Sequence, residues 1–290
     1  MQLQATCIWR VLVLRHRILS ANRRLNIVEK KIRVAVLTQE DSFIIPKNIK
    51  LLGELENLEL VAVVKIDAAG SLVNKRSLLI KGFGLIQVVK MGLVLIFNQV
   101  LNFIDSLSFF KLELLKSLKS VSIAYDSEYK IMRDPNDQSS IDWLVELNID
   151  LIVSFSAPCV FKSELLKLPE FGCINLHCSL LPKYAGLLPS FWALYERANT
   201  LGATVHKMDD RIDNGAILGQ VKVSRPSDPS MFNVIRDTKL AGGHLMVSVI
   251  RDILDGNVKT QPNQVEKKDY YSWPTIEQIR EFRRDGGRLI

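Results

Sequence analysis

Three side chains of this sequence have the types and the spacing needed to stabilise a developing negative charge: Asn175, His177 and Asp213. Asn175 and His177 end an apolar run two residues apart, so on a strand both would lie on the same face. An amide donates to an oxyanion, and an imidazole donates when protonated or acts as a base when neutral. Asp213 follows His177 by 36 residues, and a carboxylate beside that ring would orient it and favour its charged form. The alternative is structural: Asn175 and His177 satisfy loop backbone, and Asp213-Asn214-Gly215 is an ordinary turn.

These side chains need a scaffold, and the pattern from residue 32 onwards predicts an α/β fold. Two β-branched runs, at 32–38 and 58–66, flank a helix-like segment, which makes a βαβ unit and implies a parallel sheet. Further strands are expected at 150–155, 173–177, 202–209 and 216–223, and further helices at 139–149, 189–199 and 231–255. Sites on parallel sheets lie at the carboxyl ends of the strands, which is where Asn175 and His177 fall.

Composition narrows the class of protein. With 290 residues and 48% hydrophobic content, the chain can build a large globular core. The net charge of +7 is concentrated in residues 1–31, which carry +6, so the remainder has no nucleic-acid footprint. The four cysteines are Cys7, Cys159, Cys173 and Cys178, and they show neither a CxxC pair nor the spacing of a disulfide framework. We therefore expect reduced thiols, no bound metal and a cytosol-like compartment.

Two segments depart from the α/β pattern. Residues 1–31 form a basic N-terminal extension; the alternative is a mitochondrial presequence, so the expected location is cytoplasmic or, with a presequence, the mitochondrial matrix. Residues 78–118 are strongly apolar, but polar side chains interrupt them and disfavour a spanning helix: Gln87, Lys90, Asn98, Gln99 and Asn102. We expect two amphipathic helices there, packed on the domain or in contact with a membrane surface or a second copy of the chain.

The segments 175–194 and 202–218 together resemble the signature of the folate-dependent formyltransferases, the family of methionyl-tRNA, glycinamide ribonucleotide and sugar N-formyltransferases. That signature reads Asn-x-His-x-Ser-x-Leu-Pro-x-x-x-Gly-x-x-Pro, then Gly-x-x-x-His-x-x-x-x-x-x-Asp-x-Gly. Each fixed position has its match: Asn175, His177, Ser179, Leu181, Pro182, Gly186, Pro189, Gly202, His206, Asp213 and Gly215. The resemblance implies a three-layer, mostly parallel Rossmann-like sheet over residues 32–256, with 78–118 as a hydrophobic helical insertion and 257–290 as a C-terminal tail.

The resemblance also implies a reaction, the transfer of a formyl group from 10-formyltetrahydrofolate to a primary amine without a metal. The family's catalytic residues fall on Asn175 and His177, which would stabilise the oxyanion, and on Asp213, which would hold His177 charged and accept the amine's proton. The pterin is expected against the loops at 155–160 and 203–213. The residues expected to contact it are Phe155, Ser156, Ala157, Cys159, Val160, His206, Asp209 and Asp210.

The identity of the amine is a separate question. Methionyl-tRNA formyltransferases carry a further β-rich domain, for which the 34 residues of 257–290 are too few, and Ala185 stands where these enzymes often have Arg or Lys. These features favour a small acceptor such as an amino sugar on a nucleotide carrier, with tRNA as the alternative. Hydrolysis by a formyltetrahydrofolate deformylase is less favoured, because residues 1–31 are too short for that enzyme's regulatory domain. The aromatic and basic tail is expected to cover a pocket.

Overall fold

A computed structural model describes residues 31–41, 43–67, 80–106, 115–227 and 229–290. The predicted basic extension therefore lies outside the described residues except for Lys31, as do parts of the segment 78–118. Contacts divide the chain between Lys31 and Ile32, and the fold described below is that of Ile32–Ile290.

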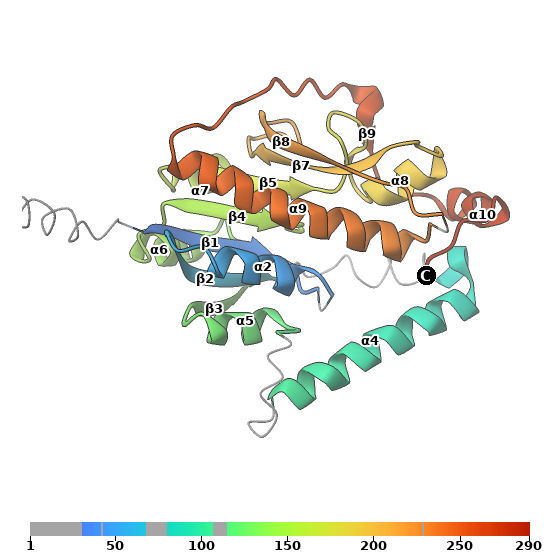
Figure 1. The fold of residues 1–290 in the computed structure, drawn as a ribbon, viewed down its shortest axis with the longest axis horizontal. Helices are drawn as coiled ribbons and strands as arrows, with labels where there is room; N and C mark the ends of the chain where they lie inside the picture. Colours follow the sequence, from blue (N-terminus) through green and yellow to red (C-terminus); the bar gives the residue numbers. More distant parts are fainter. Residues whose placement is uncertain (1–30, 42, 68–79, 107–114, 228) are drawn as a thin grey trace, which may run out of the picture. The chain divides into compact units, whose positions relative to one another are not determined.

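Seven strands form one sheet in the order β3-β2-β1-β4-β5-β7-β8 (Figure 1). Neighbours from β3 to β5 pair in parallel, whereas β7 is antiparallel to β5 and β8 is antiparallel to β7. The strands are β1 (Ile32–Thr38), β2 (Leu58–Ile66), β3 (Glu128–Met132), β4 (Leu151–Phe155), β5 (Cys173–His177), β7 (Leu201–Lys207) and β8 (Ile217–Val223). The predicted α/β class with a mostly parallel sheet is confirmed.

Helices cover both faces of this sheet because successive strand residues point to opposite sides. Val34 and Val36 of β1 pack with α2 (Ile45–Gly53), α5 (Leu118–Ala124) and α9 (Met231–Leu254). Ala35 and Leu37 of the same strand belong to a second cluster, with α6 (Gln138–Glu146) and α7 (Ser163–Lys167). The result is the expected three-layer arrangement.

Residues 257–290 rejoin the domain. After η1 (Lys267–Asp269), the strand β9 (Tyr270–Tyr271) pairs with β6 (Ala185–Gly186), and α10 (Ile276–Arg284) buries Ile279 and Phe282 in a cluster with α8 (Pro189–Tyr195). Gly186 has a φ of +94°, and a Cβ atom there would collide with the carbonyl oxygen of Tyr271. Only glycine fits this junction of the Pro-rich loop with the C-terminal segment.

In the described part of 78–118, where two helices were expected, helical residues 80–83 precede one long helix, α4 (Leu85–Ser106). It has no proline to break it and is 22 residues long, and Figure 1 shows it outside the layers that cover the sheet, with its amino end near α10. Its segment Leu85–Ile104 is long and apolar enough to cross a membrane by length and composition alone, and only 6% of its 18-residue apolar window is buried.

Candidate active site

Asn175 lies on β5, directly opposite His206 on β7. The Asn175 Nδ2 atom is 3.2 Å from His206 Nε2, and His206 Nδ1 is 2.7 Å from the carbonyl oxygen of Lys207. Because a carbonyl only accepts, His206 Nδ1 carries a hydrogen, whereas Nε2 accepts from Asn175 in the neutral ring and donates to Asp213 in the protonated ring. The antiparallel pairing of β5 with β7 thus sets the direction of the Asn175 amide and leaves its second N–H for another acceptor.

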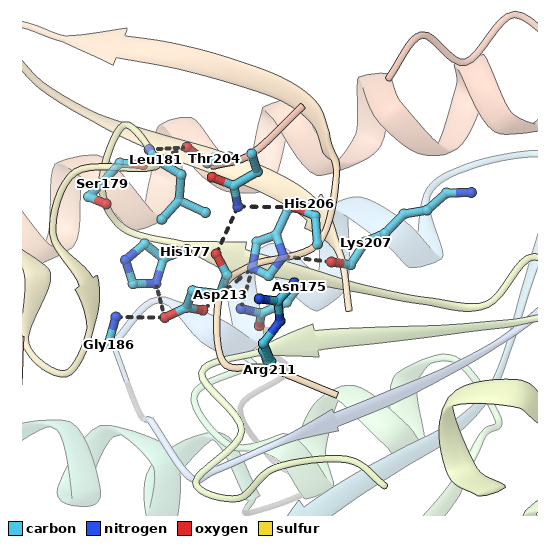
Figure 2. A network of polar contacts seen from close by, with 12 residues as sticks. Asn175, His177, Ser179, Leu181, Gly186, Thr204, His206, Lys207, Arg211 and Asp213 are labelled. Carbon is cyan, nitrogen blue, oxygen red and sulfur yellow. Dashed lines mark hydrogen bonds and ion pairs between the residues drawn. The ribbon is translucent and has the colours of Figure 1, made fainter. Parts of the chain in front are cut away.

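Asp213 lies between two histidines (Figure 2). Its Oδ2 is 3.3 Å from His177 Nδ1 and accepts from the Gly186 N–H at 2.8 Å, and its Oδ1 is 3.5 Å from His206 Nε2. Burial by itself would raise the pKa of Asp213, but His177, His206 and the Gly186 N–H lower that pKa to about 2. Asp213 is therefore a carboxylate throughout the physiological pH range.

His177 is buried, with 5% of its surface exposed. Its two ring nitrogens both face oxygen acceptors: Nε2 is 2.8 Å from the Tyr184 carbonyl oxygen and Nδ1 is 3.3 Å from Asp213. The protonated ring is the form that donates at both nitrogens. To donate to a further oxygen, His177 must share or give up its bond to Tyr184.

The loop that carries Asp213 is fixed by a residue that no sequence motif indicated. Asp213 has a φ of +52°, and the Nδ2 of Asn263 donates to the carbonyl oxygens of Asp213 and Gly215 at 2.8 and 3.1 Å. Asn263 belongs to residues 257–290, which the sequence analysis describes as a C-terminal tail. In the sequence, Asn263 is distinguished only as a polar residue in a segment without regular periodicity. The C-terminal segment therefore positions the carboxylate as well as packing on the domain.

Two cavities meet at Asn175 and Asp213, which line both. The smaller has a volume of about 160 Å³, and five of the eight predicted pterin contacts line it: Ala157, Cys159, Val160, His206 and Asp209. The larger has a volume of about 390 Å³, and its lining includes Gln39, Ser156, His177, Ser190, Lys239 and Trp273. Asn175 and Asp213 thus stand at the wall shared by two spaces and His177 lines the larger one, which suits a reaction between two bound molecules.

Two predicted pterin contacts line neither cavity, and their contact with a pterin stays a prediction. Phe155 is 1% exposed and packs in the main core, because strand alternation turns it away from Ser154, which lines the smaller cavity. Asp210 is exposed and lines neither cavity.

The cysteines near the site are protonated thiols. Burial, with a smaller contribution from Asp134, raises the pKa of Cys159 to about 11, and burial raises the pKa of Cys173 to about 12. Neither thiol is therefore a nucleophile at neutral pH. Within the described residues, no group of three or more His, Cys, Asp or Glu side chains could hold a metal ion.

Known proteins share this domain. Residues 113–250 match the family model described as formyl transferase. The bifunctional polymyxin resistance protein ArnA of Wigglesworthia glossinidia brevipalpis is 30% identical over 156 residues, which are 54% of this chain and 23% of that protein. The methionyl-tRNA formyltransferase of Agathobacter rectalis is 29% identical over 136 residues, which are 47% of this chain and 44% of that protein.

The fold has solved counterparts. The structure of WlaRD, a sugar 3N-formyl transferase in the presence of dTDP and 5-N-formyl-THF, superposes with a TM-score of 0.52 at 16% identity, covering 83% of this chain and 69% of that one. This chain spans less than half the length of the ArnA and methionyl-tRNA formyltransferase sequences that it matches. Residues 113–250, which carry Asn175, His177 and Asp213, are thus similar in sequence to the formyl transferase family, and the chain shares its fold with a solved sugar formyl transferase.

Proposed function

We propose that this protein transfers a formyl group from 10-formyltetrahydrofolate to the primary amine of a small acceptor, such as an amino sugar nucleotide. One observation carries the proposal: the Asn175 amide and the Asp213 carboxylate both stand where a 160 Å³ cavity and a 390 Å³ cavity meet. A transferase needs two substrates whose reacting atoms touch at a shared wall. Relatives in sequence and in fold are named for formyl transfer to methionyl-tRNA and to sugars.

The smaller cavity is the proposed pterin site. Ser154 lines it, and the hydroxyl of Ser154 is buried with no hydrogen-bond partner among the described residues. A buried hydroxyl without a partner costs free energy unless a ligand satisfies it, and a pterin edge offers both donors and acceptors. Asp209 adds a carboxylate acceptor to the same lining. These groups fit a bound folate, which supplies the formyl group.

The residues at the shared wall divide the chemistry between them. The free N–H of Asn175 donates to the formyl oxygen, on which negative charge develops as the amine nitrogen attacks the formyl carbon. Protonated His177, which is held by Asp213, places a positive charge beside the formyl oxygen. As the new C–N bond forms and the bond from the formyl carbon to N10 of the folate breaks, the amine loses a proton and N10 gains one.

The depressed pKa of Asp213 refines its expected role. A carboxylate with a pKa of about 2 is a weak base at neutral pH, so direct proton abstraction from an amine by Asp213 is inefficient. Its contribution is electrostatic, because it keeps the His177 ring charged and oriented. We therefore assign the proton transfer to water between the amine and the folate, with Asp213 as its hydrogen-bond acceptor.

The larger cavity is the proposed acceptor site. Its volume of about 390 Å³ is near the low end for small-molecule pockets, which suits one sugar ring better than a macromolecular end. Its lining offers the buried and unpartnered hydroxyl of Ser190, and the ammonium of Lys239 is neutralised by Asp41 at 2.6 Å. An uncharged sugar suits such a lining, and its phosphates would lie outside.

The test incubates the full chain with 10-formyltetrahydrofolate and, separately, pools of amino sugar nucleotides, methionyl-tRNA, or buffer, and follows tetrahydrofolate release. Release with an amino sugar nucleotide supports the proposal. Tetrahydrofolate release with methionyl-tRNA alone would show that the acceptor is tRNA and not a small amine. Tetrahydrofolate release in buffer alone would show that the protein hydrolyses 10-formyltetrahydrofolate. His177→Ala should abolish turnover; a variant that retains activity would show that the site is elsewhere.

A further inference from the structure

The helix α4 is barely buried, and its less exposed side is mixed: Met91 packs against the cluster that contains Phe83 and Phe282, and two polar side chains make hydrogen bonds. Its side facing the domain carries polar groups: Asn98 is 8% exposed, its Nδ2 donates to the Val94 carbonyl oxygen at 2.8 Å, and its Oδ1 accepts from Lys116 Nζ at 3.4 Å. Gln87 on the same side accepts from the Ile290 N–H at 3.3 Å. A soluble helix normally buries its apolar stripe.

The opposite side of α4 is apolar and open to solvent. Residues three or four apart form one outward stripe, and each is 48–70% exposed: Leu85, Val89, Leu93, Ile96 and Val100. Ile86 and Phe97 widen this stripe, and Lys90 flanks it. Exposed apolar surface that is continuous over about four turns marks a contact with a membrane or another protein.

Basic side chains lie at the amino end of the stripe. The ring centroids of Phe83 and Phe282 are 6.1 Å apart, and Arg283 Nη1 donates to the Gly82 carbonyl oxygen at 3.0 Å, so α10 packs beside the start of α4 (Figure 1). Arg280, Arg283 and Arg284 line an open surface pocket of about 610 Å³ together with Glu277. Neither Arg280 nor Arg284 has an ion-pair partner in the part of the chain that the structure describes. Such a cluster attracts anionic headgroups.

From the apolar stripe and the adjacent arginines we propose that α4 lies in the surface of an anionic phospholipid bilayer, with its outward side in the acyl region and Arg280 and Arg284 on the phosphates. This assigns a membrane contact to the protein in addition to the proposed formyl transfer. An amphipathic helix with apolar and basic components binds lipid surfaces in this way.

The two ends of α4 exclude a transmembrane arrangement. Phe83 before the helix and Leu118 after it are both buried in the same folded unit, and Lys116 returns to contact Asn98 midway along α4. A spanning helix would place that ammonium group and the returning backbone inside the hydrocarbon, where both are unfavourable. A helix lying in the interface keeps them on the protein side.

The experiment measures binding of the full chain to phosphatidylcholine vesicles with and without phosphatidylglycerol, by co-flotation. Leu93→Gln with Val100→Gln removes two outward apolar side chains without changing charge and should weaken binding on the order of a hundredfold. Arg280→Glu with Arg284→Glu should weaken binding to anionic vesicles roughly twentyfold or more. Val145→Gln on α6, which also replaces an exposed apolar residue at 55% exposure, is the matched control and should bind as the unchanged protein does.

Each other result overturns the proposal. Failure of the unchanged protein to float with anionic vesicles would refute a membrane contact. Full binding by the Leu93/Val100 variant would place the contact elsewhere, for example on the basic residues 1–31. If the unchanged protein is a dimer without lipid and the Leu93/Val100 variant is a monomer, the stripe binds a second copy of this chain. Vesicle binding is read without any assay of formyl transfer, so failure of one proposal leaves the other standing.

Discussion

Replacing Asp213 by Asn removes a buried charge while keeping an oxygen that can accept from the Gly186 N–H. In the folded protein the pKa of Asp213 is about 2, against an ordinary value of 3.8. That difference corresponds to about 2 kcal/mol of stabilisation of the ionised form. Because the folded-state pKa is the lower one, this contribution is present above pH ~4 and is lost as the pH falls through ~2, with roughly half remaining at pH 3. The Asp213→Asn protein should therefore be about 2 kcal/mol less stable at pH 7 and close to the unchanged protein near pH 2.

Urea unfolding followed by tryptophan fluorescence at pH 7, 5 and 3 measures this difference. Asp210→Asn is the control: Asp210 is exposed in the same loop, and its substitution should change the free energy of unfolding by less than about 0.5 kcal/mol. A stability gap between Asp213→Asn and the unchanged protein that stays the same from pH 7 to pH 3 would refute the electrostatic account. In the transfer assay, Asp213→Asn should also lower kcat, by a factor on the order of a thousand, because the His177 ring loses the carboxylate that orients it.

Three further substitutions probe the site and its frame. Asn175→Ala should lower kcat by roughly a hundredfold or more with folate affinity little changed, since its N–H acts on charge that develops during reaction; an unchanged kcat in the transfer assay would remove Asn175 from that role. Gly186→Ala should cost about 2 kcal/mol or more in urea unfolding, whereas Gly256→Ala, at a φ of +67° with no atom within 4 Å, should cost about 1 kcal/mol. Equal losses would mean that the contact with the Tyr271 carbonyl does not matter. Phe155→Ala should cost about 3–5 kcal/mol in the same measurement without altering folate affinity in the folded fraction, and weakened folate binding there would contradict the assignment of Phe155 to the core.

The elements of the α/β domain were predictable because their signals are local. The βαβ pattern at 32–66 and the strand at 173–177 depend on apolar periodicity and side-chain alternation, and the structure contains their strands at the predicted bounds. The C-terminal contacts were not predictable, because Asn263 and the β6–β9 pair act on residues 48 to 85 positions away in the chain. No local pattern encodes such partners.

The sequence by itself determined the candidate chemistry, since Asn175, His177 and Asp213 have the required groups at a spacing that a strand and a loop can bring together. It also predicted the mostly parallel sheet that presents them. Only the tertiary structure decided that His206, opposite Asn175 across an antiparallel pair, joins the Asp213 network, and that Phe155 belongs to the core. Strand register depends on which segments pair in space, and the burial of each side of α4 depends on what packs against it, so neither can be read from periodicity alone.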